Sequence, residues 1–243
     1  MTSFPEQMAE TLLKYNMIEK GSRVLVAFSG GVDSLALLCA FIELKEEWAL
    51  DIAAAHLDHG LRGDRARDDA DWAEDFCGRR GITFFRGYWA GFLEVKGGRS
   101  PEEAARNARR RFLEATLADW RGDAIALGHH LDDQAETVLI RLLAGTGMRG
   151  LGGMWPVRGP YIRPLIGTDR KMILDYIVGL GLSPRYDETN DNVAYLRNRL
   201  RLRVIPELKA CNPGFVAAAG RMAELARKED AYLDRLAWEA LDG

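Results

Sequence analysis

Short apolar runs alternate with amphipathic helical segments over the first two thirds of the chain. The expected strands are Arg23–Phe28, Asp51–Leu57, Thr83–Tyr88, Ala124–Gly128 and an extended piece around Tyr161–Leu165. The expected helices between them are Leu35–Leu44, Arg65–Gly78, Pro101–Trp120 and Asp132–Leu143. This alternation predicts an α/β fold: a doubly wound, mostly parallel five-stranded sheet with helices on both faces. Ligands of such sheets bind beyond the carboxyl ends of the strands.

After Leu165 the pattern becomes helical. The segments in order are a helix over Arg170–Leu180, a polar loop over Ser183–Asn192, a basic stretch over Arg197–Arg203 and a long amphipathic helix from Pro213 to Leu241. We therefore expect one domain over residues 1–208 and a small helical C-terminal extension over residues 209–243.

The sequence Ser29-Gly30-Gly31-Val32-Asp33-Ser34 joins the first expected strand to the first expected helix. Its glycines allow the backbone to come close to an anion, and a helix start directs N–H groups and the helix dipole toward it. The two serines add hydroxyl donors. A carboxylate such as Asp33 is tolerated among phosphates when a divalent cation lies between them. The run therefore favours a phosphate site over the alternative, a tight turn in which Asp or Ser is a helix cap.

Two further strand ends carry polar side chains. The second strand ends in His56-Leu57-Asp58-His59-Gly60-Leu61-Arg62, which we interpret as a pocket-lining loop, since the spacing of a metal site is missing. The fourth ends in Gly128-His129-His130-Leu131-Asp132-Asp133, where His129 and Asp133 can face the same way on a first helical turn. A histidine beside a carboxylate can exchange protons near neutral pH. The alternative is N-capping by Asp132 with histidine packing.

Arginines follow one face of the Pro101–Trp120 helix. Arg106, Arg109 and Arg110 are spaced by three and four residues. A guanidinium can bind phosphate oxygens through two hydrogen bonds, although charged runs on helices are often solvated faces. Both interpretations stay open at this point.

Composition restricts the class of protein. The 243 residues are 47% hydrophobic and 28% charged with a net charge of −3, so any nucleic-acid surface must be local. No apolar run is long enough to span a bilayer, and the N-terminus lacks the layout of a signal peptide. Cys39, Cys77 and Cys211 lie far apart in the sequence. We therefore expect a cytoplasmic protein with no disulfide framework, no metal cluster and no membrane partner.

The motifs together resemble the tRNA(Ile)-lysidine synthetase family of N-type ATP pyrophosphatases, or PP-loop enzymes. To the phosphate loop and the two strand ends they add Glu103–Arg109, Gly147–Met154, Ile162–Leu165, Asp187–Asn190 and Arg197–Arg201. The resemblance covers about Arg23 to Leu208. It implies that ATP adenylates the C2 oxygen of the wobble cytidine in a tRNA(Ile) with a CAU anticodon. The amine of free lysine then displaces AMP to give lysidine.

The resemblance also implies roles for residues of this chain. Residues Ser29, Gly30, Gly31, Val32, Asp33, Ser34, His56 and Arg106 would bind ATP, with Asp33 as the ligand of Mg²⁺. Asp33, Arg109, His129 and Asp133 would be catalytic. Arg197, Arg199, Arg201 and Arg203 are candidates for contact with tRNA, although some of them are expected to pair with acidic groups instead.

This chain departs from the family in two ways. Arg110 stands where the family often has a tyrosine, so Arg106 and Arg109 are hard to separate as the phosphate ligand. Family members usually continue into C-terminal tRNA-binding domains, so residues 209–243 would be a linker or the start of such a region. A homodimer is left open.

Two other functions share features with this sequence. A tRNA thiolase shares the phosphate loop, but sulfur transfer needs paired cysteines, and these cysteines are not paired in sequence. A non-catalytic nucleotide- or RNA-binding module would be expected to have lost Asp33, Arg109, His129 or Asp133, which are all present.

Overall fold

The computed structural model describes residues 2–58, 64–89, 101–185 and 192–241, and the chain forms two compact units. The first comprises Met1–Gly128, Pro156–Leu165 and Lys171–Tyr186, and the second His129–Trp155, Ile166–Arg170 and Asp187–Gly243. Each unit is therefore built from separate stretches of chain. The expected boundary at residue 208 stays a prediction.

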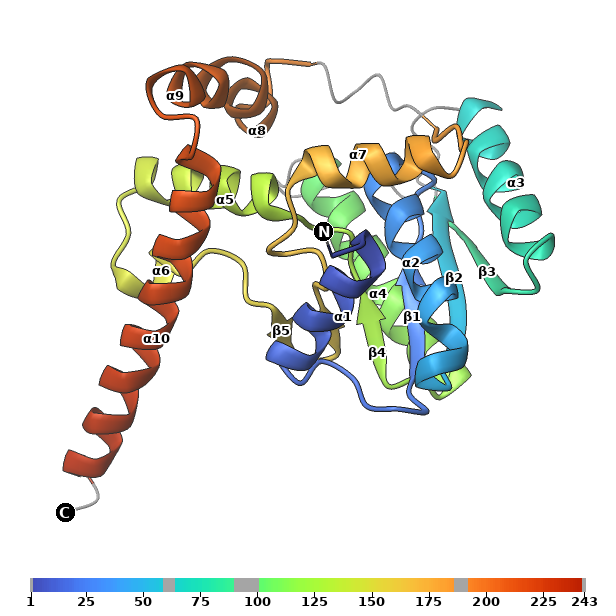
Figure 1. Ribbon diagram of the computed structural model, residues 1–243, viewed down its shortest axis with the longest axis horizontal. Coiled ribbons are helices and arrows are strands. Elements are labelled where there is room, and N and C mark those ends of the chain that lie inside the picture. Colours follow the sequence, from blue (N-terminus) through green and yellow to red (C-terminus); the bar gives the residue numbers. More distant parts are fainter. Residues whose placement is uncertain (1, 59–63, 90–100, 186–191, 242–243) are drawn as a thin grey trace. The chain divides into compact units, whose positions relative to one another are not determined.

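A mixed sheet forms the centre of the first unit (Figure 1). In the described residues it has the order β3-β2-β1-β4-β6-β5, and every pairing is parallel except that of β5 with β6. The strands are β1 (Arg23–Ala27), β2 (Asp51–Asp58), β3 (Thr83–Tyr88), β4 (Ala124–Ala126), β5 (Val157–Arg158) and β6 (Tyr161–Ile162). The predicted fold class is confirmed. The expected number of five strands was wrong, because a two-residue run such as β5 has no periodicity to detect.

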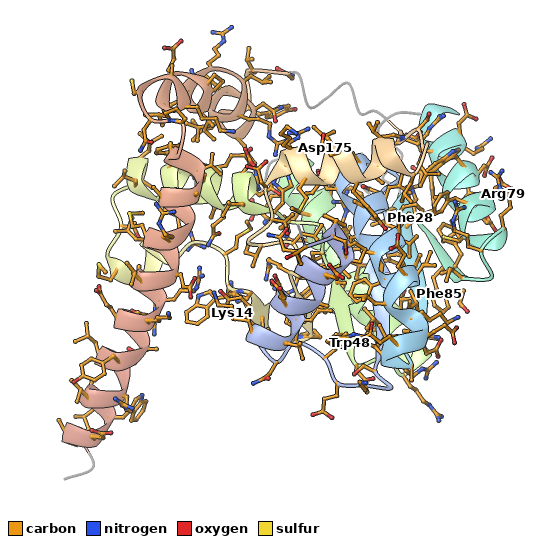
Figure 2. The ribbon with its side chains drawn as sticks, in the orientation of Figure 1. Lys14, Phe28, Trp48, Arg79, Phe85 and Asp175 are labelled. Carbon is orange, nitrogen blue, oxygen red and sulfur yellow. The ribbon has the colours of Figure 1, made fainter. Side chains whose placement is uncertain are left out.

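Helices cover both faces of this sheet. One face carries α1 (Phe4–Lys14), α2 (Val32–Trp48), α3 (Asp64–Gly78) and α7 (Arg170–Gly179), and the other carries α4 (Pro101–Trp120). Alternate residues of β1 divide between the two layers. Val24 and Val26 are buried with the larger group of helices, and Leu25 is buried with Leu113 and Leu117 of α4. Phe28, just after β1, packs on Phe76 of α3 with ring centroids 5.8 Å apart (Figure 2).

Helix α1 was not predicted from the sequence. Its N-cap is Ser3, whose hydroxyl accepts from the Glu6 N–H while the Glu6 carboxylate accepts from the Ser3 N–H. Phe4, Met8 and Leu12 form a buried stripe on it. This capping box with apolar residues at i, i+4 and i+8 is a helix signal that is recognisable in the sequence.

The second unit is helical. Its helices are α5 (Leu131–Leu143), α6 (Met148–Leu151), α8 (Leu196–Arg199), the π-helical turn η3 (Leu200–Val204), α9 (Ile205–Cys211) and α10 (Phe215–Leu241). Helix α10 approaches α5 closely at Gly220, where a Cβ would lie 2.5 Å from Leu131 Cδ1. Ala135, Ile205, Val216 and Ala219 form the core of this unit.

Candidate functional site

The predicted phosphate loop of the first unit is a tight turn with its own hydrogen bonds. Gly30 has φ +80°, a conformation that glycine adopts readily. The Ser29 N–H donates to Ser34 Oγ (3.2 Å), and the two hydroxyl oxygens lie 3.0 Å apart. Helix α2 starts directly after Gly31, and no side chain in the described segments caps it. The first N–H groups of α2 are therefore available to an anion, and the helix dipole favours one there.

Two other parts of the first unit hold this loop in place. A Cβ on Gly128 would lie 3.1 Å from the carbonyl carbon and oxygen of Asp33, so any larger residue at this position after β4 would crowd the first turn of α2. On another side, the Arg185 N–H donates to the Gly30 carbonyl oxygen (2.9 Å), and Arg185 Nε donates to Asp69 of α3 (2.6 Å). Arg185, which follows α7, thus links the phosphate loop to α3 through hydrogen bonds.

His56 is buried at the carboxyl end of β2. Its Nδ1 lies 2.9 Å from the Phe28 carbonyl oxygen, so Nδ1 carries the proton and Nε2 is an acceptor in the neutral ring. Burial lowers the pKa of His56, and the positive charge of Arg109 lowers it further against the opposing effect of the Phe28 bond. His56 is therefore neutral near pH 7, and Arg109 of α4 lies within its electrostatic reach.

Arg109 and Arg106 have different charged neighbours in the structure. The positive charge of Arg109 lowers the pKa of His56. The positive charge of Arg106, one turn earlier on the same helix, lowers the pKa of Arg163, which follows β6. The ATP-binding role of Arg106 stays a prediction. His59, Gly60, Leu61 and Arg62, which were expected to line the pocket, lie outside the described residues, as do Asp187, Glu188, Thr189 and Asn190 of the family motif.

In the second unit, Asp133 belongs to the cap of α5. His130 is the N-cap residue, and its Nδ1 accepts from the Asp132 N–H (3.2 Å). Asp133 Oδ2 accepts from the His130 N–H (3.0 Å). The α5 N-terminus is therefore capped by His130 and Asp133, and the expectation that Asp132 caps it was wrong. His129 directly precedes this cap.

Asp133 and Glu136 share a cluster with two arginines of the basic stretch. Arg197 Nε and Arg201 Nε each donate to the fully buried Glu136 carboxylate at 2.6 Å. Arg201 Nη2 and Arg197 Nη2 also donate to Asp133 Oδ1, at 2.9 and 3.2 Å. Burial raises the pKa of Asp133, but electrostatic interactions with His130, Arg197 and His129 and the hydrogen bond from the His130 N–H outweigh it, so the pKa lies below its usual value. This carboxylate is ionised at neutral pH.

The alternating arginines divide between two helical faces. Arg197 and Arg201, four residues apart, turn toward α5, whereas Arg199 and Arg203 are exposed. The expectation that some of the four pair with acidic groups is confirmed for Arg197 and Arg201. Glu136, which receives them, was not predicted as a site residue, although its place one turn after Asp133 on the same helix was a usable signal.

The motif Gly147–Met154 is held by side chains from α5 and α10. Arg141 Nη1 donates to the Gly150 and Gly153 carbonyl oxygens at 2.8 and 2.7 Å. The Gln134 side chain donates to the Met154 carbonyl (3.2 Å) and accepts from the Met154 N–H (2.7 Å). Arg227 of α10 donates to the carbonyl of Gly152. These bonds satisfy carbonyl and N–H groups of the main chain in and after the short helix α6.

The cysteines do not provide a reactive thiol pair. Cys39 and Cys77 are buried and reduced, and burial raises the pKa of Cys39 to about 11 and that of Cys77 to about 12. Such thiols are protonated at neutral pH and are poor nucleophiles. Cys211 is exposed, in the second unit.

In the described part of the chain, no group of three or more His, Cys, Asp or Glu side chains is arranged to hold a metal ion. None of the helices described combines the length and apolar character needed to cross a membrane. Mg²⁺ is commonly held by one or two carboxylates together with substrate phosphates, so a single Asp33 at the loop fits that ion.

Two relatives show what this chain is similar to in sequence. The tRNA(Ile)-lysidine synthase of Caldanaerobacter subterraneus is 40% identical over 231 residues, covering 94% of this chain and 50% of the relative. That of Symbiobacterium thermophilum is 42% identical over 243 residues, covering 97% and 50%. The chain thus spans about half the length of the curated relatives it matches.

A solved structure and a family model define the fold. The U34-tRNA thiolase NcsA from Methanococcus maripaludis superposes with a TM-score of 0.74 at 21% identity, covering 91% of this chain and 78% of that chain. At this identity the likeness shows the fold alone. The model of the PP-loop domain matches residues 2–208, which include the phosphate loop, His56, Arg109 and the α5 cluster. The chain therefore belongs to the PP-loop domain family.

Proposed function

We propose that this chain carries the ATP-dependent chemistry of a tRNA(Ile)-lysidine synthetase. The observation that carries the proposal is 40–42% identity to such synthases over more than nine tenths of the chain. In the proposed reaction, the C2 oxygen of the wobble cytidine attacks the α-phosphate of ATP and pyrophosphate leaves. The amine of lysine then attacks C2, AMP leaves with the C2 oxygen, and the amine loses a proton. A tRNA substrate and reduced cysteines fit the cytoplasm.

The first unit would bind ATP. Its phosphate loop would receive the β- and γ-phosphates on the N–H groups at the start of α2 and on the hydroxyls of Ser29 and Ser34. Asp33 would hold Mg²⁺, which supplies neutralising charge for the leaving pyrophosphate when bound. Arg109 would stabilise the negative charge that develops at the α-phosphate. Neutral His56 avoids placing a second full positive charge next to Arg109.

The second unit would contribute to base activation and lysine transfer. The ionised Asp133 can attract the positive charge of the incoming amine, and His129 can take a proton from it. Arg197 and Arg201 hold Asp133 and Glu136 in fixed positions, so we assign them to positioning rather than to tRNA. The exposed Arg199 and Arg203 remain the tRNA candidates of this stretch. The association of two copies stays a prediction.

The buried, protonated thiols of Cys39 and Cys77 weigh against the thiolase alternative. AMP release that depends on both lysine and tRNA(Ile) tests the proposal, and Asp33→Asn is the matched variant. We expect turnover in the wild type and none in the variant, with equal melting temperatures. Lysine-independent but sulfide-dependent release would support the thiolase instead, and turnover by Asp33→Asn at the wild-type rate would contradict the metal role.

A further inference from the structure

Three arginines from three elements gather on one face of the sheet at its carboxyl edge. Arg158 lies in β5 directly opposite Tyr161 of β6, and the Arg163 N–H donates to the Pro156 carbonyl oxygen (2.9 Å). The hairpin therefore continues to Arg163. Side chains alternate along a strand, so Arg163 lies on the same face of the sheet as Tyr161, which is two residues earlier. Arg158 lies on that face as well, because it is directly opposite Tyr161.

That face is the one covered by α4. Tyr161 Oη lies 3.2 Å from Glu114 Oε1 and 3.4 Å from the Arg110 carbonyl oxygen. Arg163 lies two residues beyond Tyr161 toward the carboxyl edge of the sheet. Arg106 lies one turn before Arg110 toward the start of α4, which runs against the strands. Arg163 and Arg106 are therefore both displaced toward the carboxyl edge from the contact between Tyr161 and Arg110, which brings the two arginines close together.

The cluster concentrates positive charge in the ligand-free protein. Burial, together with the charges of Arg158 and Arg106, lowers the pKa of Arg163 to about 10. Glu114 is already bonded by Arg110 (2.9 Å). Within the described segments, neither Arg106 nor Arg158 forms an ion pair with a carboxylate. Like charges brought together cost free energy, which an anion with several negative groups would offset.

We propose that Arg106, Arg158 and Arg163 form a binding site for backbone phosphates of the RNA substrate. The inference rests on the proposed function, which supplies the RNA. ATP is a poorer candidate, because the phosphate loop follows β1, and β4 separates β1 from β6 and β5. At about 4.8 Å per strand, the cluster lies about 10–14 Å along the sheet from the loop. The inference therefore assigns Arg106 to RNA in place of the ATP-binding role predicted for it, and leaves Arg109 with ATP.

The test variant is Arg106→Ala with Arg158→Ala, which removes two exposed charges and keeps the partly buried Arg163 for folding. The control variant is Lys20→Ala with Arg79→Ala, which has the same change in net charge at the opposite edge. Arg79, labelled in Figure 2, directly follows α3 and forms an ion pair with Asp75. Binding of a tRNA(Ile) transcript is measured across a salt series, and binding of ATP is measured by calorimetry.

We expect the test variant to lower the salt dependence of log K by about 1.4–1.8, the contribution of two phosphate contacts. ATP affinity should stay within about twofold, and replacing both arginines by lysine should restore the slope. A wild-type slope in the test variant, an equal loss in the control, a loss of ATP affinity alone, or no tRNA binding by the wild type would each overturn the inference. Because binding is measured without turnover, a protein that binds as expected but makes no lysidine would contradict only the proposed function.

Discussion

The close fit of Gly128 under the phosphate loop makes Gly128→Ala an informative substitution. The added Cβ would lie 3.1 Å from the Asp33 carbonyl carbon and oxygen and 3.2 Å from the Ser34 nitrogen. All three neighbours are main-chain atoms in the first turn of α2, so no side chain can rotate to make room. The loop itself, or the end of β4, must move by a few tenths of an ångström.

The size of the effect follows from these contacts. Overpacking of this kind costs about 1–3 kcal/mol, and for a chain of this size each kcal/mol lowers the melting temperature by about 2–4 °C. Moving the first turn of α2 also misaligns its N–H groups with the phosphates. The loss of one hydrogen bond to a charged group costs about 1.5–3 kcal/mol, which weakens ATP binding by about ten- to a hundredfold.

Calorimetric ATP titration and thermal unfolding measure both effects. Gly167→Ala is the matched control, because its Cβ would meet nothing within 4 Å and its φ is not in the left-handed region. The control should match the wild type in both measurements. Wild-type ATP affinity in a folded Gly128→Ala protein would refute the argument that contact with this glycine sets the position of the phosphate loop.

Three further predictions concern the buried charged groups. Glu136→Gln should lower the free energy of unfolding by about 3 kcal/mol, since Arg197 and Arg201 lose a buried anionic partner. Urea unfolding measures this, and the control Glu239→Gln, at an exposed ion pair, should lower the free energy of unfolding by less than about 0.5 kcal/mol. Asp133→Asn keeps an acceptor for the α5 cap but removes the negative charge, so turnover per folded molecule should fall by at least about 10²-fold. Unchanged turnover would show that Asp133 only caps the helix. The pKa of His56 is lowered on folding, so the unfolded chain takes up that proton first as pH falls. Melting temperature should thus fall more steeply between about pH 7 and about pH 5.5 in the wild type than in His56→Gln, and parallel curves would contradict this.

Local patterns sufficed for much of the fold. The predicted helix Pro101–Trp120 agrees with α4 at both ends, and the strand Thr83–Tyr88 agrees with β3. Hydrogen bonds in helices and the pleat of strands impose periods of 3.6 and 2 residues, which appear directly in the order of apolar side chains. The phosphate loop was also visible, because its strand, glycines and helix start are contiguous in the chain.

Long-range partners could not be obtained in this way. Glu136 and Arg201 are 65 residues apart, and Arg185 meets a glycine 155 positions before it. Such pairs depend on how helices and loops pack after the elements have formed, and no local period records that packing. The same holds for β5, which exists because β6 lies beside it.

The sequence by itself therefore determined the α/β class, the phosphate loop and the residue types of the site. Tertiary structure decided how those residues are used. It turned Arg197 and Arg201 toward buried carboxylates, left Arg199 and Arg203 exposed, and separated Arg109 from Arg106. The physical reason is that an arginine has the same chemistry at each of these positions, and only the charges that packing places around it select its partner.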